Sequence, residues 1–141
     1  MSTSNFKEHL KPSVLVVDDE PKICSLIKRF LDQSHLFRNV VTADTVGIAL
    51  MKIRNEEFDL VIIDYNLPDK QGTEFIDIVS KSIKHRKMKY LLISGYLDNR
   101  SMMDVINVGV KNVLVKPFTR LSLINKVCEI MNLKNPYTAQ E

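Results

Sequence analysis

The segment FDLVIID, at residues 58–64, is a short apolar run that ends in an acid, and SVLVVD at residues 13–18 has the same form. A continuous apolar run of this length is typical of a strand that is buried on both faces of a parallel sheet. Three further runs, at residues 39–43, 89–94 and 111–116, complete a set of five expected strands.

Helical patterns fill the gaps between these strands. Pro21 suits the first turn of a helix, and apolar residues follow it at three- and four-residue spacing as far as Leu31. Alternating strands and helices predict an α/β fold with a parallel sheet, helices on both faces and right-handed crossovers. The other expected helices are Val46–Ile53 after a cap at Asp44 or Thr45, Gly72–Ile83, Asp98–Val108 ended by Gly109, and one from a cap at Thr119 to about Leu133.

The composition suits one soluble domain that folds without a disulfide or a structural metal. The chain has 141 residues, of which 45% are hydrophobic and 26% charged. No apolar run approaches the ~18 residues of a membrane helix, and the polar N-terminus does not resemble a signal peptide, so we expect a cytoplasmic protein. Cys24 and Cys128 are expected to be free structural thiols. The basic segment Lys81–Lys89 is interpreted as a solvated loop.

Polar residues stand where four of the expected strands end. Asp18 and Asp19 end the first strand, Asp64 the third, Ser94 the fourth and Lys116 the fifth. Because parallel strands end along one edge of the sheet, these side chains are predicted to converge on one pocket. Three carboxylates repel one another unless cations compensate their charge. Lys116 supplies one positive charge, and a divalent metal would supply the rest. Ligands that are all oxygen atoms favour Mg²⁺ as that metal.

A carboxylate beside Mg²⁺ can act as a nucleophile toward a phosphoryl group. Asp64 stands alone on a central strand, which suits the acceptor, and the adjacent Asp18 and Asp19 suit a metal seat. Lys116 and the metal would neutralise charge on the phosphoryl oxygens, and Ser94 would donate a hydrogen bond to one of them.

These residues resemble a known family. The receiver domain of two-component response regulators (the CheY-like superfamily) has the same motifs in the same order and spacing. The motifs are DDEP at 18–21, D-x-x-x-P-x-x-x-G at 64–72, SG at 94–95 and KPF at 116–118.

The resemblance covers about residues 12–133 and leaves two expected tails, a flexible one at residues 1–11 and a frayed one at residues 134–141. It implies a flavodoxin-like, doubly wound, five-stranded parallel sheet of order 2-1-3-4-5 with five helices. A stand-alone receiver and a piece of a larger regulator both fit the chain.

The resemblance also implies a set of metal ligands. Asp19 and Asp64 would ligate Mg²⁺ directly, together with the backbone carbonyl of Asn66. Asp18 would act mainly through water.

By the same resemblance, Asp64 accepts a phosphoryl group from a sensor histidine kinase or a histidine phosphotransfer protein in a phosphorelay. Lys116 and Ser94 would contact that group, and the Lys116–Pro117 peptide is expected to be cis. The domain would switch conformation to control a partner or an output domain, or would dimerise on phosphorylation. It would be no enzyme with a separate substrate, although it would catalyse its own phosphorylation and slow dephosphorylation. Neither a membrane nor a nucleic acid is expected as a partner.

One position departs from the family pattern. Family members usually carry Tyr or Phe three residues before the strand-five lysine, and that position here is Val113. Valine is stiff and has no ring to swing inward. Gly95 and Tyr96 are therefore the candidate output residues, since the glycine gives the loop freedom and the tyrosine offers a large surface.

Three alternatives share parts of this pattern. A haloacid-dehalogenase-type phosphatase needs Asp-x-Asp after the first strand, and residues 18–20 are Asp-Asp-Glu. A flavodoxin needs a phosphate-binding loop there, which Glu20-Pro21-Lys22 does not provide. A constitutive interaction module would not need the complete acid set with Ser94 and Lys116.

Overall fold

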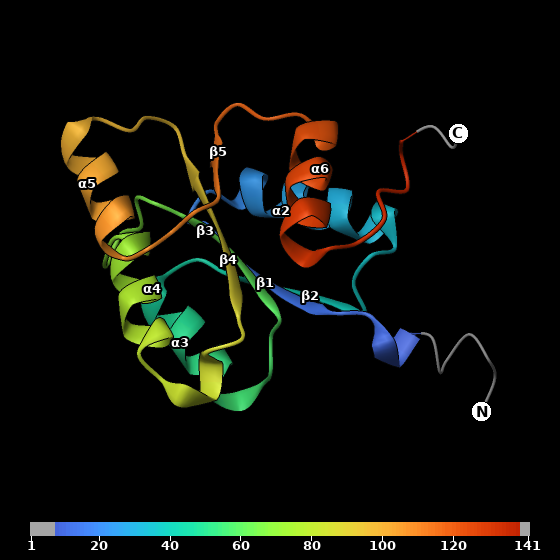
Figure 1. Ribbon diagram of the computed structural model, residues 1–141, viewed down its shortest axis with the longest axis horizontal. Coiled ribbons are helices and arrows are strands. Elements are labelled where there is room, and N and C mark those ends of the chain that lie inside the picture. The colour runs from blue at the N-terminus through green and yellow to red at the C-terminus, as the bar shows by residue number, and fades with distance from the viewer. Residues whose placement is uncertain (1–7, 139–141) are drawn as a thin grey trace.

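The computed structural model describes residues 8–138, which form one parallel sheet flanked by helices (Figure 1). The strand order is β2-β1-β3-β4-β5, and every pair is parallel. The flavodoxin-like order predicted from the sequence is therefore confirmed. The strands are β1 (Ser13–Val17), β2 (Asn39–Ala43), β3 (Leu60–Asp64), β4 (Lys89–Ser94) and β5 (Val113–Val115).

Helices cover both faces of this sheet. Helices α2 and α6 lie on one face, and α3, α4 and α5 lie on the other (Figure 1). Within residues 8–138, no helix has the length and apolar character needed to cross a bilayer. The helices are α2 (Pro21–Ser34), α3 (Val46–Asn55), α4 (Gly72–Ser80), α5 (Asn99–Asn107) and α6 (Arg120–Met131), with a 3₁₀ turn η1 (Ile83–His85).

Alternate residues of each strand pack against opposite layers of helices. In β1, Leu15 and Val17 face α3 and α4, whereas Val14 and Val16 face α2 and α6. All five residues of β1 and all five of β3 are buried. This two-sided burial explains why both strands are continuously apolar in the sequence.

The helix ends carry the expected signals. The hydroxyl of Thr45 accepts a hydrogen bond from the N–H of Ile48 at 3.1 Å, so Thr45 rather than Asp44 is the local cap of α3. Thr119 caps α6 in a reciprocal pair with Ser122. Gly109 follows α5 with a φ of 76°, in the left-handed region where glycine has no steric cost.

Helix α4 is shorter than the sequence predicted, and the expectation that it reaches Ile83 is wrong. The helix ends at Ser80, and Ile83 opens the separate turn η1 with its side chain 81% exposed. Ser82 is extended, with φ −82° and ψ 128°, which breaks the helical path. The hydroxyl of Ser80 donates to the carbonyl of Asp77 at 3.4 Å, and such local bonds weaken the end of a helix.

The two expected tails include residues that are ordered parts of the fold. The prediction of flexible tails at residues 1–7 and 139–141 lies outside the described residues. Residues 8–10 form a helical turn. Tyr137 packs against the α2 and α6 core, and the guanidinium of Arg120 lies 4.6 Å from its ring centroid. The contacts of the Tyr137 ring hold residues 134–138 against the domain.

Candidate functional site

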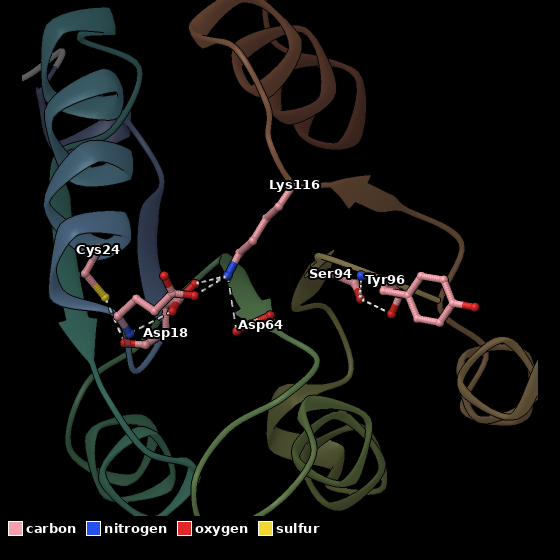
Figure 2. Close-up of polar contacts among 7 residues, drawn as sticks. Asp18, Cys24, Asp64, Ser94, Tyr96 and Lys116 are labelled. Carbon is pink, nitrogen blue, oxygen red and sulfur yellow. Dashed lines mark hydrogen bonds and ion pairs between the residues drawn. The ribbon is translucent and has the colours of Figure 1, made fainter. Parts of the chain in front are cut away.

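The carboxyl ends of the strands place the candidate residues along one edge of the sheet. The N–H of Tyr65 donates to the carbonyl of Ile93 at 2.8 Å, and the N–H of Lys116 donates to the carbonyl of Ser94 at 2.8 Å. These bonds extend the parallel ladder past β3 and β5. They fix the backbone from which the side chains of Asp64 and Lys116 meet (Figure 2).

Lys116 is the centre of a group of carboxylates. Its ammonium lies 3.0 Å from Oδ2 of Asp18, 3.3 Å from Oδ2 of Asp64 and 3.3 Å from Oε1 of Glu20. Asp18 is 1% exposed and Asp64 6% exposed, whereas Glu20 is on the surface. One ammonium therefore faces three carboxylates, and the pocket keeps an excess of negative charge.

This excess charge changes the proton affinities of the buried groups. Burial, together with the nearby charge of Asp18, raises the pKa of Asp64 to about 6. Burial also raises the pKa of Asp18. Burial alone would lower the pKa of Lys116, but the carboxylates of Asp18 and Asp64 outweigh it, so that pKa is raised and the side chain stays charged.

The donor set fits a divalent cation. Carboxylate oxygens of Asp18, Glu20 and Asp64 lie within 4.8 Å of one another. Hard oxygen ligands of this kind suit Mg²⁺. A cation here would also offset the charge of Asp18, which adds to burial in raising the pKa of Asp64.

The structure gathers Glu20 into this group, where the sequence pointed to Asp19. The carboxylate of Asp18 accepts a hydrogen bond from the N–H of Glu20 at 2.9 Å, a local turn that precedes the pairing of Glu20 with Lys116. Asp19 is exposed and outside the group, although its charge still acts on Asp64. The spacing Asp-x-Glu could have indicated this grouping from the sequence, because side chains two residues apart in an extended segment point to the same side of the chain.

Ser94 is fully buried at the end of β4, and its hydroxyl bonds to the loop that follows the strand. Its hydroxyl donates to the carbonyl of Tyr96 at 2.9 Å and accepts from the N–H of the same residue at 3.3 Å. Figure 2 shows this pair on the far side of Asp64 from the Asp18 cluster. Tyr96 is 75% exposed, and no atom lies within 4 Å of a side-chain carbon built on Gly95. Ser94 is the last residue of β4, and its hydroxyl ties the strand to the loop that follows. Among the described residues, that hydroxyl makes no hydrogen bond to the ammonium of Lys116.

The loop between β3 and α4 turns tightly behind Asp64. The N–H of Gly72 donates to the carbonyl of Tyr65 at 2.7 Å, and a side-chain carbon at Gly72 would lie 2.3 Å from the carbonyl oxygen of Asp64. Only glycine allows this approach. Asn66 is exposed within the turn and forms an isolated antiparallel bridge with Gln71. The Lys116–Pro117 peptide, on the other side of the pocket, is cis.

Val113 lies on the face of the sheet covered by α5. It is half-buried and pairs with Leu92 of β4. The buried aromatic residue next to the candidate acceptor is Tyr65, which is 4% exposed. Its hydroxyl donates to Oδ2 of Asp104, on α5, at 2.6 Å. A direct polar contact therefore joins the end of β3 to α5.

Cys24 also borders the pocket, and it is a structural thiol there. Its Sγ donates to the backbone carbonyl of Asp18 at 3.1 Å (Figure 2). Burial, with the charge of Asp18, raises the pKa of Cys24 to about 11, so the thiol is protonated at neutral pH.

Comparisons with known proteins agree with this geometry. The family model of the response regulator receiver domain matches residues 14–128. The chain is 27% identical over 117 residues to chemotaxis protein CheY-3 of Vibrio cholerae, a match that covers 83% of this chain and 89% of that protein. It is 28% identical to hybrid signal transduction histidine kinase D of Dictyostelium discoideum, covering 89% of this chain and 8% of that protein.

A solved structure gives the same result in three dimensions. A CheY-like response regulator receiver domain protein from Methanospirillum hungatei has a TM-score of 0.78 and 30% sequence identity, covering 86% of this chain and 94% of that chain. Because the family model spans most of the sequence and the sheet order agrees, the chain belongs to the response regulator receiver domain family, the phospho-acceptor domains of two-component signal transduction.

Proposed function

We propose that Asp64 is the phospho-acceptor of this receiver domain. The observation that carries the proposal is the contact of Asp64 with Lys116 at 3.3 Å, in a pocket that also holds the buried Asp18 and the surface Glu20. A carboxylate in such a place is close to the cation that an incoming phosphoryl group needs. Burial and the charge of Asp18 raise the pKa of Asp64, and a second cation bound beside the carboxylate would favour its charged form.

The transfer would proceed by attack of an Asp64 carboxylate oxygen on phosphorus. An O–P bond forms, the N–P bond to the donor imidazole breaks, and the donor nitrogen keeps the electron pair. The donor ring carries a proton on its other nitrogen, so it leaves as neutral imidazole. Lys116 would then turn from the carboxylates toward the phosphoryl oxygens, where its ammonium offsets their charge. Ser94 would exchange its bond to Tyr96 for a charge-assisted bond to the same group.

The metal proposed for this site is Mg²⁺, which supplies positive charge to the phosphoryl oxygens when it is bound. We propose that Asp19 and Asp64 hold it directly with the carbonyl of Asn66, and that Asp18 acts through water. Glu20, which pairs with Lys116 at 3.3 Å, is assigned to positioning that lysine.

The proposed donor is a phosphohistidine on a sensor kinase or a phosphotransfer protein, in the cytoplasm. The domain would catalyse its own phosphorylation and slow dephosphorylation and would act on no separate substrate. Residues 12–133 would be the working unit. The output would be a partner or an output domain controlled by the loop of Gly95 and Tyr96, or a phosphorylation-dependent dimer, with no membrane or nucleic acid contact of its own.

Labelling with acetyl phosphate and Mg²⁺ tests the acceptor. Intact-mass spectrometry should show one added phosphoryl group on the wild type and none on Asp64→Asn. Asp44→Asn is the matched control, since it removes an exposed carboxylate from the same edge of the sheet and should label normally. Full labelling of Asp64→Asn would overturn the assignment.

The same assay tests the metal ligands. Asp19→Asn should abolish metal-dependent labelling, Asp18→Asn should weaken it less, and Glu20→Gln should retain it. Equal labelling in excess chelator would remove the metal from the proposal. Loss of labelling in Glu20→Gln with normal labelling in Asp19→Asn would move the ligand role to Glu20.

A further inference from the structure

In the loop between β3 and α4, Tyr65 is buried and bonded to β4 and α5, whereas residues 66–71 are held to the rest of the domain at few points. Leu67 packs against the core, and the N–H of Gly72 closes the turn on the carbonyl of Tyr65. Asn66, Pro68 and Lys70 are exposed. A tight turn of this kind can shift as a unit unless another element restrains it.

Asp69 supplies that restraint. Its Oδ1 accepts a hydrogen bond from the N–H of Val46 at 3.0 Å, and its Oδ2 accepts one from the N–H of Gly47 at 2.9 Å. Both donors are in the first turn of α3, more than twenty residues earlier in the chain. Among the described residues, Asp69 makes the only side-chain hydrogen bonds from residues 66–71 to another element.

The carboxylate at position 69 is well matched to this place. Four N–H groups of a helix amino end lack partners within the helix, and the helix dipole favours a negative charge there. Thr45 already satisfies the N–H of Ile48, so Asp69 completes the cap from a distant loop. Both oxygens of Asp69 accept hydrogen bonds from the helix. An amide side chain could not reproduce this, because only its oxygen accepts and its NH₂ group donates.

We propose that Asp69 is a positioning residue for the phosphoryl-transfer site, which it serves by tethering the loop that carries Asn66 to the amino end of α3. This inference rests on the proposed function, in which the carbonyl of Asn66 faces the metal. Mg²⁺ demands near-ideal octahedral geometry, so a small drift of the loop would weaken binding. Groups that hold metal ligands in place are typically worth about 10- to 100-fold in metal affinity.

Two matched controls separate tethering from its side effects. Thr45→Ala removes the local cap of the same helix and leaves the loop attached, so it reports the cost of weakening α3 alone. Asp44→Asn removes one exposed negative charge close to Asp18 and Asp19 without touching the loop. Asp69→Ala removes both tethering bonds, and Asp69→Asn retains one acceptor and serves as a milder variant if the alanine protein does not fold.

The experiment has two readouts on the full chain. The first is amide exchange at residues 66–72 in metal-free protein, which should speed up in Asp69→Ala and remain unchanged in Thr45→Ala. The second is a MgCl₂ titration followed by amide chemical shifts, in which Asp69→Ala should bind about 10-fold more weakly and Asp69→Asn should fall between it and wild type. Both controls should stay close to wild type.

The outcomes distinguish this inference from the proposed function. If Asp69→Ala matches Thr45→Ala in both readouts, Asp69 is a helix cap only and the inference is wrong. If Asp69→Ala matches Asp44→Asn in the titration while the loop amides are unchanged, the lost negative charge alone explains any change in Mg²⁺ affinity. The inference is then also wrong. If wild type neither binds Mg²⁺ nor labels, the proposed function fails, and the metal-free exchange still decides whether Asp69 tethers the loop.

Discussion

The acceptor region and the response region of the domain are built in opposite ways. In the acceptor region, β1 and β3 are buried throughout, and Asp18 and Asp64 are tied to Lys116. In the response region, α5 has a single buried residue, Val105, and β5 has three residues, none of them fully buried. The large exposed apolar side chains of this region are Tyr96, Met102, Met103, Ile106 and Val115.

The difference indicates a division of labour. Buried charge is concentrated where the backbone is most firmly packed, so the acceptor region can hold uncompensated carboxylates without losing its shape. Segments with few buried contacts open at a lower free energy than the core. A change of charge at Asp64 can therefore move α5 and its flanking loops at lower cost than it can move β1 or β3.

The largest expected effect comes from removing the cation of the acceptor region. Lys116→Ala leaves Asp18 and Asp64 buried without their cation, which should lower the free energy of unfolding of the metal-free protein by about 3–5 kcal/mol at pH 7. Urea unfolding measures this, with Lys111→Ala, an exposed lysine near β5, as the control. The variant should retain some labelling but lose the conformational response. Amide shifts on phosphorylation identical to those of wild type would contradict the assigned role of Lys116.

Removing the acceptor charge should act in the opposite direction. The folded-state pKa of Asp64 is about 6 against an ordinary 3.8, so between these values the folded state binds more protons than the unfolded state. The contribution of Asp64 to the stability of the wild type therefore falls as pH rises through this window. Asp64→Asn should be more stable than wild type by about 2–3 kcal/mol at pH 7 without metal, and the gain should vanish near pH 4.

Unfolding curves across this pH range, with Asp44→Asn as the charge control, check the prediction. A gain that persists at low pH would mean that side-chain packing, and not the titration of Asp64, sets the difference.

Activation should separate the two regions in amide exchange. With beryllofluoride and Mg²⁺, protection should change in residues 94–106 more than in β5, by about 1–2 kcal/mol in local opening free energy. The reasons are that Ser94 must leave Tyr96 to meet the new group, and that Val113 has no ring to move. The same reagents on Asp64→Asn provide the control. Changes confined to β5 and α6, with residues 94–106 silent, would refute this route.

The smallest effect is expected where the two regions touch. Tyr65→Phe removes the hydrogen bond to Asp104 and should cost about 1 kcal/mol of stability while speeding amide exchange in α5. Tyr90→Phe is the matched control, because the buried hydroxyl of Tyr90 finds no partner among the described residues. If both variants lose the same stability and α5 exchanges as in wild type, the Tyr65–Asp104 contact does not connect the regions.

The sequence was a good guide wherever one element decides the outcome. The predicted strands at 39–43 and 89–94 have the same bounds as β2 and β4. The pattern of apolar residues within a single strand is enough to predict that strand. The end of α4 was missed by three residues because the stripe that includes Ile83 continues past the local bonds of Ser80. The last strand was predicted two residues too early, at Lys111, whose polar neighbour Asn112 precedes the observed β5.

The site was predictable to the level of strand ends and no further. Parallel strands bring Asp18, Asp64 and Lys116 together by topology alone, so their meeting followed from the order of elements. Which acid turns toward the lysine depends on the short turn between Asp18 and Glu20. Contacts of Asp69 with α3 and of Tyr65 with α5 join residues far apart in the chain, and no local pattern specifies such pairs.

The close approach of Gly72 to the carbonyl oxygen of Asp64 has a consequence for how such domains diverge in evolution. The contact is with the backbone of residue 64 and not with its carboxylate. A descendant that lost the acceptor would therefore gain no freedom at residue 72, where any side chain would still collide with that oxygen. We expect the glycine to outlast the aspartate in lineages that abandon phosphorylation, which makes it a marker of ancestry, whereas Asp64 is a marker of chemistry.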